Sequence, residues 1–246
     1  MAAAIQQKSG FEKWQDGLSN ASSDAKWNSH DCDIRAAVNE YNYHLMKTNG
    51  YFSLDWQLIK AMVWVESGAE SPEWKTKPMQ IGVPGDPGLS SFLSGKEGGD
   101  LIIPPSYKNY FSRSAVAVNP IQNIRAGIGY VLIRMARMDY ATILDSDSKT
   151  YDVMVKSGDS LDRIAKEKGT TVDLLRRLNR DTTLLRPGQK LMYQKASVQR
   201  VITGWRSITP STIAQRYNGG GDPNYEKKLD YALMLIKQGK VAECTQ

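Results

Sequence analysis

Histidine and cysteine are scarce in this chain of 246 residues, which has two of each. A zinc hydrolase needs a cluster of His, Cys or carboxylate ligands, and a serine or cysteine hydrolase needs a histidine base beside its nucleophile. Neither His30 nor His44 lies in such a motif. We therefore expect no metal, no cofactor, and a chemistry carried by carboxylates. Cys32 and Cys244 could form one disulfide in an oxidising compartment or remain two separate thiols.

Long apolar runs are also missing. The chain has no stretch of about 18 apolar residues, and its first residues, MAAAIQQKSGFEKW, lack the apolar segment of a secretion signal. We therefore expect a soluble protein without membrane insertion. The formal net charge of +6 suits a polyanionic partner, such as nucleic acid, anionic lipid or the carboxylates of a bacterial cell wall.

One apolar stripe ends in a carboxylate. Leu54, Leu58 and Met62 recur at helical spacing in SLDWQLIKAMVWVESGAE, and the next position on their stripe is Glu66. Burial penalises the charged form of a carboxyl and so raises its pKa. Glu66 could then stay protonated near neutral pH and give its proton to a glycosidic oxygen. The alternative is that the helix frays at Gly68 and Glu66 turns into water.

Other helices are predicted from their end signals. Ser53 predicts the N-cap of the helix that carries Glu66, and Asn119 followed by Pro120 predicts the start of another. Residues 71–100 are dense in Gly and Pro, so we expect a long surface loop there. Residues 1–28 show little periodicity and read as an arm packed over the rest.

From about residue 151 the pattern changes to strand, two short helices and strand. This segment resembles a LysM module, on the motifs Gly158-Asp159-Ser160-Leu161, Ile164-Ala165 and Gly188-Gln189-Lys190-Leu191. LysM modules bind N-acetylglucosamine-containing glycans between two loops, here residues 157–161 and 185–188. The resemblance implies ligand contacts from Gly158, Asp159, Ser160, Leu161, Pro187 and Gly188.

Two features of this segment leave alternatives open. Gly158 and Asp159 could simply form the turn and helix cap that the fold needs. Residues 151–195 hold five Lys and five Arg against five Asp and one Glu, a net charge of +4. Such a module suits an anionic polymer better than neutral chitin, although a solvated basic face is the simpler explanation.

Four short motifs occur in the order and spacing of the soluble lytic transglycosylase family, which they resemble. They are Glu66-Ser67, Pro78-Met79-Gln80-Ile81, Asn123-Ile124 followed by Gly127 and Tyr130, and Tyr217-Asn218. The resemblance implies a lysozyme-like helical fold with Glu66 as the catalytic acid. It also implies that Tyr217 orients this acid through a hydrogen bond, and that Ser67, Met79, Gln80 and Asn218 line the cleft. Packing alone is the alternative for Tyr217 and Met79.

The motifs depart from the family in ways that bear on the reaction. Lys77-Pro78 stands where the family has Gly-Leu, and Arg216 and Gly219 replace two alanines, so the shape of the cleft should differ. A transglycosylase needs one carboxyl, because the 6-hydroxyl of the sugar attacks. An inverting hydrolase needs a second carboxyl, about 6.5–9.5 Å from the first. Asp86 is a candidate, although an Asp before Pro usually sets a turn.

Together these patterns predict a mainly α protein in which a small β-α-α-β domain interrupts a lysozyme-like one. The expected domains are residues 1–150 with 196–246, and the LysM insert at 151–195. We expect a peptidoglycan muramidase that cleaves the β-1,4 bond between N-acetylmuramic acid and N-acetylglucosamine, most readily as a lytic transglycosylase. The alternatives are a lysozyme-type hydrolase and a non-catalytic wall-binding protein.

The expected partners are peptidoglycan glycan strands and not nucleic acid. Action in the periplasm or cell wall, without a Sec signal, would require a secretion apparatus, a phage lysis route or a leader outside this sequence. Delivery as an antibacterial effector would also imply a neutralising immunity protein.

Overall fold

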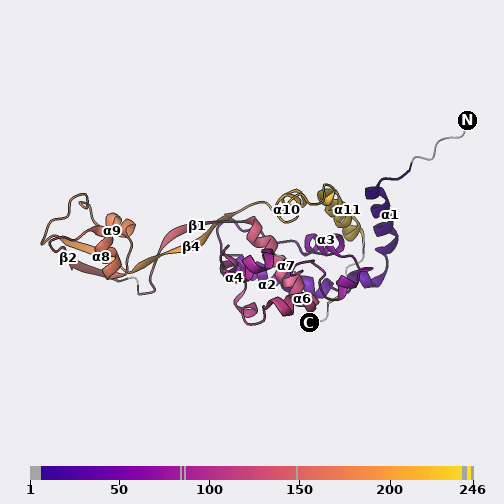
Figure 1. Cartoon of the computed structure of the whole chain (residues 1–246), viewed down its shortest axis with the longest axis horizontal. Helices are drawn as coiled ribbons and strands as arrows, with labels where there is room; N and C mark the ends of the chain where they lie inside the picture. Colours follow the sequence, from indigo (N-terminus) through magenta and orange to yellow (C-terminus); the bar gives the residue numbers. More distant parts are fainter. Residues whose placement is uncertain (1–6, 84, 86, 148, 240–242, 245–246) are drawn as a thin grey trace, which may run out of the picture. The chain divides into compact units, whose positions relative to one another are not determined.

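The computed structural model of the chain describes residues 7–83, 85, 87–147, 149–239 and 243–244. The chain divides into two compact units (Figure 1). The first unit comprises Met1–Arg137 and Ile202–Gln246, and the second comprises Met138–Val201. Within the described ranges, no helix has the length and apolar character needed to cross a membrane.

The first unit is helical. Its α-helices are α1 (Gly10–Ala21), α2 (Asp31–Leu45), α3 (Trp56–Glu66), α4 (Pro87–Ser94), α5 (Gly99–Ile102), α6 (Arg113–Val118), α7 (Pro120–Met135), α10 (Pro210–Arg216) and α11 (Tyr225–Gln238). Three short 3-10 helices lie between them, η1 (Ala25–Asn28), η2 (Pro72–Lys75) and η3 (Pro105–Tyr107). This composition agrees with the predicted mainly α class.

The core of the first unit is built around α3 and α7. Helix α3 packs against α11 and α2, and α7 packs against α2, α4, α5 and α6. Both helices bury their apolar faces almost completely, including Ile59 and Met62 of α3 and Ile124, Ile128 and Leu132 of α7. Burial of each such side chain stabilises the fold by roughly 1.5–3 kcal/mol. The end of α3 is therefore held by well-packed neighbours.

Several local predictions are confirmed and others are wrong. Asn119 caps α7 as predicted, its side chain accepting from the backbone N–H of Gln122. The N-cap of α3 is Asp55 instead of Ser53. Residues 71–100 are not one loop, because they contain η2, α4 and α5 and bury Leu89 and Phe92. The Gly and Pro residues give this segment a low helix propensity, so its short helices depend on contacts with the core.

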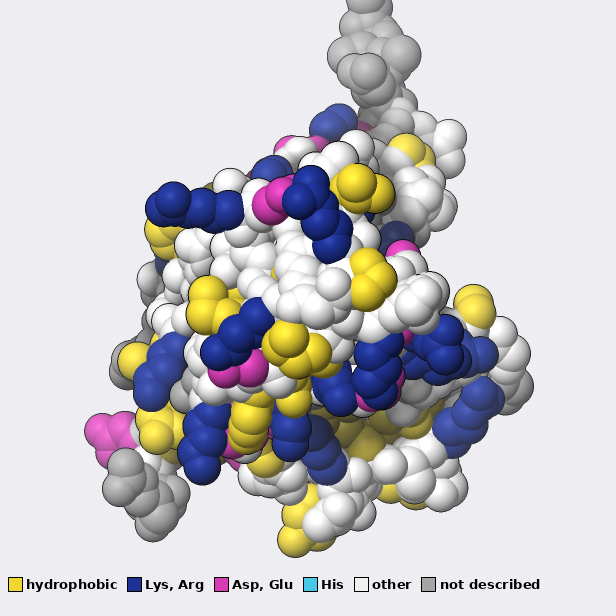
Figure 2. Space-filling view, turned by 90° about the vertical axis from the view of Figure 1, so that its left-hand side faces the viewer, with side chains coloured by type: hydrophobic (Ala, Val, Ile, Leu, Met, Phe, Trp, Pro, Cys, Tyr) yellow, Lys and Arg dark blue, Asp and Glu magenta, His cyan; other side chains and the backbone are white. Residues whose placement is uncertain are grey.

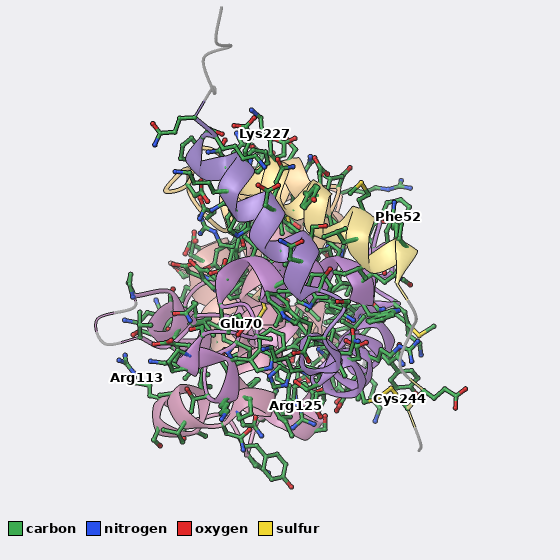
Figure 3. The ribbon with its side chains drawn as sticks, turned by 90° about the vertical axis from the view of Figure 1, so that its right-hand side faces the viewer. Phe52, Glu70, Arg113, Arg125, Lys227 and Cys244 are labelled. Carbon is green, nitrogen blue, oxygen red and sulfur yellow. A yellow bond between two sulfur atoms is a disulfide. The ribbon has the colours of Figure 1, made fainter. Side chains whose placement is uncertain are left out.

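The N-terminal arm begins with a well-capped helix. Ser9 and Glu12 form a reciprocal capping box at the start of α1. Trp14 of α1 then packs edge to face against Tyr231 of α11, with ring centroids 6.2 Å apart. Figure 3 shows α1 running beside α11. Helix α1 of the arm is thus held against α11.

The second unit contains two helices, one complete pair of strands and most of a second pair. Strand β2 (Thr150–Met154) pairs antiparallel with β3 (Lys190–Gln194), with Val153 opposite Leu191. Helices α8 (Leu161–Lys168) and α9 (Val172–Leu178) complete the predicted order, around a core of Val155, Leu161, Ile164, Ala165, Leu175 and Leu191. Strands β1 (Ala136–Leu144) and β4 (Ala196–Trp205) also pair, although no sequence pattern predicted them.

A disulfide links Cys32 near the start of α2 to Cys244 near the chain end. The two Cα atoms are 5.5 Å apart, across a sequence separation of 212 residues. Figure 3 labels Cys244, and the guanidinium of Arg35 donates to its sulfur at 3.5 Å. Of the two alternatives left open by the sequence, the structure has the bridge.

This bridge predicts that reduction destabilises the protein. The chain-entropy model gives about 5 kcal/mol for so long a loop, and measured values commonly lie nearer 2–4 kcal/mol. Urea unfolding with and without reductant should therefore show a lower midpoint in reductant. The double variant Cys32→Ser, Cys244→Ser is the control, since its midpoint should match the reduced protein and ignore the reductant. A wild-type midpoint that reductant leaves unchanged contradicts the bridge.

Candidate active site

The carboxyl of Glu66 lies at the C-terminal end of α3 and meets the first residue of α11. The hydroxyl of Tyr225 donates a hydrogen bond to its Oε1. Glu66 is half-buried, whereas Tyr225 is almost fully buried. The carboxyl of Glu66 thus keeps some access to solvent, while the hydrogen bond from the buried Tyr225 fixes its position.

Burial raises the pKa of Glu66 to about 7, and the hydrogen bond from Tyr225 opposes this rise. The reason is that low-dielectric surroundings penalise the carboxylate, whereas a donated hydrogen bond stabilises it. Burial, followed by the nearby carboxylate, also raises the pKa of Tyr225 well above its usual value, so this hydroxyl stays protonated. Glu66 is therefore poised to lose or accept a proton near neutral pH.

The Met-Gln segment is held beside the end of α3 by two side chains. The hydroxyl of Ser67 donates to the carbonyl of Pro78 at 3.0 Å. The hydroxyl of Tyr217, at the end of α10, donates to the carbonyl of Met79 at 3.0 Å. These bonds join residues from three of the four sequence motifs that surround Glu66.

Asn123, from the remaining motif on α7, holds the same Met-Gln segment. Its side-chain oxygen accepts from the backbone N–H of Met79 at 2.8 Å. Its amide nitrogen donates to the carbonyls of Ile81 and Val116 at 2.8 and 2.9 Å. Asn123 is fully buried, so these bonds satisfy polar groups that no water reaches. Gly127 lies against Met79, and a Cβ on it would come within 2.7 Å of the Met79 Cβ.

Gln80 has a backbone conformation that a residue with a side chain rarely adopts. Its φ is +52°, the one positive φ of a non-glycine residue in the described ranges. Such a conformation costs roughly 1–3 kcal/mol and persists only where the surroundings enforce it, commonly at functional sites. The side chain of Gln80 is half-buried and therefore accessible from solvent. This geometry presents an amide beside the segment that Asn123 holds.

The roles predicted for two site residues need correction. Tyr217 was expected to bond Glu66, but that bond comes from Tyr225, which no sequence motif placed at the site. Met79 was expected to touch substrate, yet its side chain is fully buried against α7. No local signal marks Tyr225, because it is separated from Glu66 by 159 residues.

The remaining predictions stay open. The side-chain oxygen of Asn218 accepts from the backbone N–H of Asp222 at 2.9 Å, which leaves its amide nitrogen as the group able to meet a ligand. Ser67 and Gln80 are half-buried, so substrate contact remains a prediction for both. Asp86, the candidate second carboxylate, lies outside the described residues.

In the second unit, the two loops predicted to bind glycan lie side by side. The N–H of Gly188 donates to the carbonyl of Val155 at 2.8 Å, and the N–H of Val155 donates to the carbonyl of Gln189 at 2.8 Å. Gly158 and Gly188 have φ of +80° and +86°, which suits glycine in tight turns. Gly158, Pro187 and Gly188 are exposed and available to a ligand.

Three other residues of these loops stabilise the fold of the domain. The carboxylate of Asp159 accepts from the backbone N–H of Lys156 at 2.8 Å, and Ser160 caps α8. Leu161 is buried in the core of this unit, so the predicted ligand contact of its side chain does not fit. The turn and cap were the alternative reading of Gly158 and Asp159, and the structure shows the turn, with Ser160 as the cap.

The comparison with known protein families gives a match within the second unit. Residues 153–192 match the family model of the LysM domain. LysM domains bind peptidoglycan glycan chains, which associates this part of the chain with the cell wall. No curated protein matches the chain. No solved structure matches it either.

The pKa of Glu66 should depend on Tyr225 and not on Tyr217. Tyr225→Phe removes a donor that stabilises the carboxylate, so the pKa of Glu66 should rise above about 7. The matched control is Tyr217→Phe, whose hydroxyl donates to a carbonyl and should leave that pKa nearly unchanged. Carbon NMR titration of labelled Glu carboxyls measures both values. Equal shifts in the two variants would disprove this assignment.

The Asn123 clamp should contribute strongly to stability. Asn123→Ala leaves one buried N–H and two carbonyls without this partner, so the free energy of unfolding should fall by about 2–4 kcal/mol. Asn119→Ala on the same helix removes only a cap and should cost about 1 kcal/mol. Urea unfolding of both variants tests the difference. Similar losses would show that the clamp is no stronger than the cap.

Proposed function

We propose that this chain is a peptidoglycan muramidase in which Glu66 is the catalytic acid and the LysM domain holds the glycan strand. The observation that carries the proposal is the environment of Glu66, a half-buried carboxyl whose pKa is raised to about 7 and whose position is fixed by Tyr225. General acids operate best when their pKa lies near the working pH. A carboxyl with an ordinary pKa would have lost its proton.

The first chemical step follows from this geometry. Protonated Glu66 gives its proton to the oxygen of the β-1,4 bond, the C1–O bond of N-acetylmuramic acid breaks, and positive charge develops at C1. The carboxylate that forms is stabilised by the hydrogen bond from Tyr225. Tyr225 is therefore a positioning residue that favours the product state of the acid.

The second step distinguishes a transglycosylase from a hydrolase. In a transglycosylase the carboxylate of Glu66 takes the proton of the muramic acid 6-hydroxyl, whose oxygen bonds to C1 and closes a 1,6-anhydro ring. Burial raises the pKa of Glu66 and the hydrogen bond from Tyr225 opposes that rise, so this carboxyl can serve first as acid and then as base. The transglycosylase reaction needs no other carboxyl, whereas activation of water by inversion needs a second one. We therefore propose the lytic transglycosylase reaction.

The compartment follows from the disulfide and the LysM domain. Disulfides persist in oxidising spaces such as the periplasm, and Cys32 and Cys244 are bridged. We infer that the protein acts in the periplasm or cell wall, where its glycan substrate lies. A bacterium that delivers such an enzyme to its rivals would need an immunity protein for its own wall.

The test compares two carboxyls of the same short segment. Glu66→Gln should lower cleavage of purified sacculi by a factor of about 100–10,000, the usual contribution of a general acid. Glu70→Gln is the control, because Glu70 is exposed and pairs with Lys26 at 2.6 Å (Figure 3). Binding of both variants to sacculi should stay close to wild type.

The products decide the remaining question. Mass spectrometry of digested peptidoglycan should show 1,6-anhydro ends, whereas reducing ends would indicate a lysozyme-type hydrolase. A wild-type protein that binds sacculi but releases no fragments would instead support the wall-binding protein without catalysis, which the LysM match alone also allows.

A further inference from the structure

Each of the two glycan-facing turns of the LysM domain begins with a cation. Lys156 opens the first turn, in which its N–H donates to the Asp159 carboxylate at 2.8 Å and its carbonyl accepts from the Asp159 N–H at 3.1 Å. Arg186 opens the second, in which its N–H donates to the side chain of Gln189 at 3.0 Å and its carbonyl accepts from the Gln189 N–H at 2.9 Å. We call residues 156–159 and 186–189 the turn pair.

Backbone hydrogen bonds bring the two cations to one edge of the domain. Val155 directly precedes Lys156 and bonds both Gly188 and Gln189 of the second turn. The starting residues of both turns are thereby held beside the exposed backbone of Gly158, Pro187 and Gly188. A strand lying on that backbone would pass within reach of two long basic side chains.

Lys156 is at most weakly coupled to an acid, because the pKa of Glu167 is lowered chiefly by its hydrogen bond to Lys168 and to a lesser extent by the charge of Lys156. The side chains of Lys156 and Arg186 are exposed, and neither belongs to an ion pair among the described residues. Asp159, the acid of the turn pair, is half-buried and accepts the backbone N–H of Lys156. Other cations of the domain do have acidic partners, namely Lys168, Arg177, Lys190 and Lys195. Figure 2 shows Lys and Arg side chains spread over the visible face, with fewer Asp and Glu.

We propose that Lys156 and Arg186 make the LysM domain prefer N-acetylglucosamine-containing strands that carry carboxylates over neutral strands such as chitin. The inference rests on the proposed glycan binding by this domain and specifies its ligand. A guanidinium can hold a carboxylate through two parallel N–H bonds, while an ammonium acts as a flexible point charge. The exposed backbone of the turn pair supplies contacts to the sugar, and the cations supply the choice between charged and neutral polymers.

Peptidoglycan offers such carboxylates from two sources. One is the lactyl group of N-acetylmuramic acid, which is a free carboxylate once the peptide is removed. The other is the stem peptide, whose own carboxylates hang from the intact strand. Chitin has the same backbone linkage and neither group, so it serves as the neutral reference.

The size of the effect follows from the exposure of the two side chains. A solvent-exposed ion pair contributes about 0.2–1 kcal/mol. Loss of both cations should therefore weaken binding to carboxylate-bearing strands by about two- to thirtyfold, with little change for chitin. The preference should also fade at high salt, because the Debye length shrinks from about 30 Å at 0.01 M to about 3 Å at 1 M.

The experiment uses the full chain carrying Glu66→Gln, so that the strands stay intact. Dissociation constants are measured for chitin oligosaccharides, amidase-stripped glycan strands and intact sacculi, and for sacculi whose carboxyls have been amidated. The test variant adds K156Q and R186Q. The control adds K149Q and K195Q, which remove the same charge from the opposite end of the β2–β3 pair, roughly 20 Å along the strand from Lys156.

The proposal expects stripped strands or sacculi to bind more tightly than chitin, and the test variant to lose this preference while the control keeps it. Tight binding of stripped strands identifies the lactyl carboxylate as the source, and tight binding of sacculi alone identifies the stem peptide. Equal affinity for all four ligands, or equal losses in both variants, would overturn the proposal and leave glycan binding intact. Failure to bind any of the glycans would instead reject the proposed function of the domain.

Discussion

The burial of one carboxyl is the constraint on which the catalytic proposal depends. Glu66 lies at the end of a helix packed on its apolar face, and desolvation raises its pKa to about 7. Burial alone would hold the proton too firmly for an acid that must release it. The hydrogen bond from Tyr225 offsets part of that penalty, so the group can move between its two protonation states. The balance between these two effects would set the working pH of the proposed enzyme.

The rest of the first unit holds the surroundings of this acid rigid. Asn123 reaches from the buried face of α7 to the Met-Gln segment, and Ser67 and Tyr217 bond the same segment from α3 and the end of α10. Met79 is buried as the anchor of this arrangement, which leaves Gln80 in its strained conformation beside it. In this motif, Met79 is therefore a buried anchor, while the half-buried amide of Gln80 donates to the carbonyl of Lys77 at 3.4 Å.

The proposed function places glycan binding and glycan cleavage in different units, which would use different physical interactions. The LysM domain has a small apolar core, two turns joined by backbone bonds and an excess of positive charge. The proposed recognition of glycan would use exposed backbone and long-range attraction. The proposed catalysis by the first unit would instead use the partial desolvation of a single carboxyl. The disulfide from α2 to Cys244 adds a covalent constraint on the first unit, and such bonds persist mainly in oxidising compartments.

The sequence by itself determined the features that local signals encode. The stripe that ends at Glu66, the cap at Asn119 and the β-α-α-β order of the insert are all readable from neighbouring residues, because helix periodicity and caps are short-range. Only the tertiary structure decided the partner of Glu66, the burial of Met79, the pairing of β1 with β4 and the bridge from Cys32 to Cys244. These contacts join residues far apart in the chain, and no periodicity or spacing records which distant groups the packed core brings together.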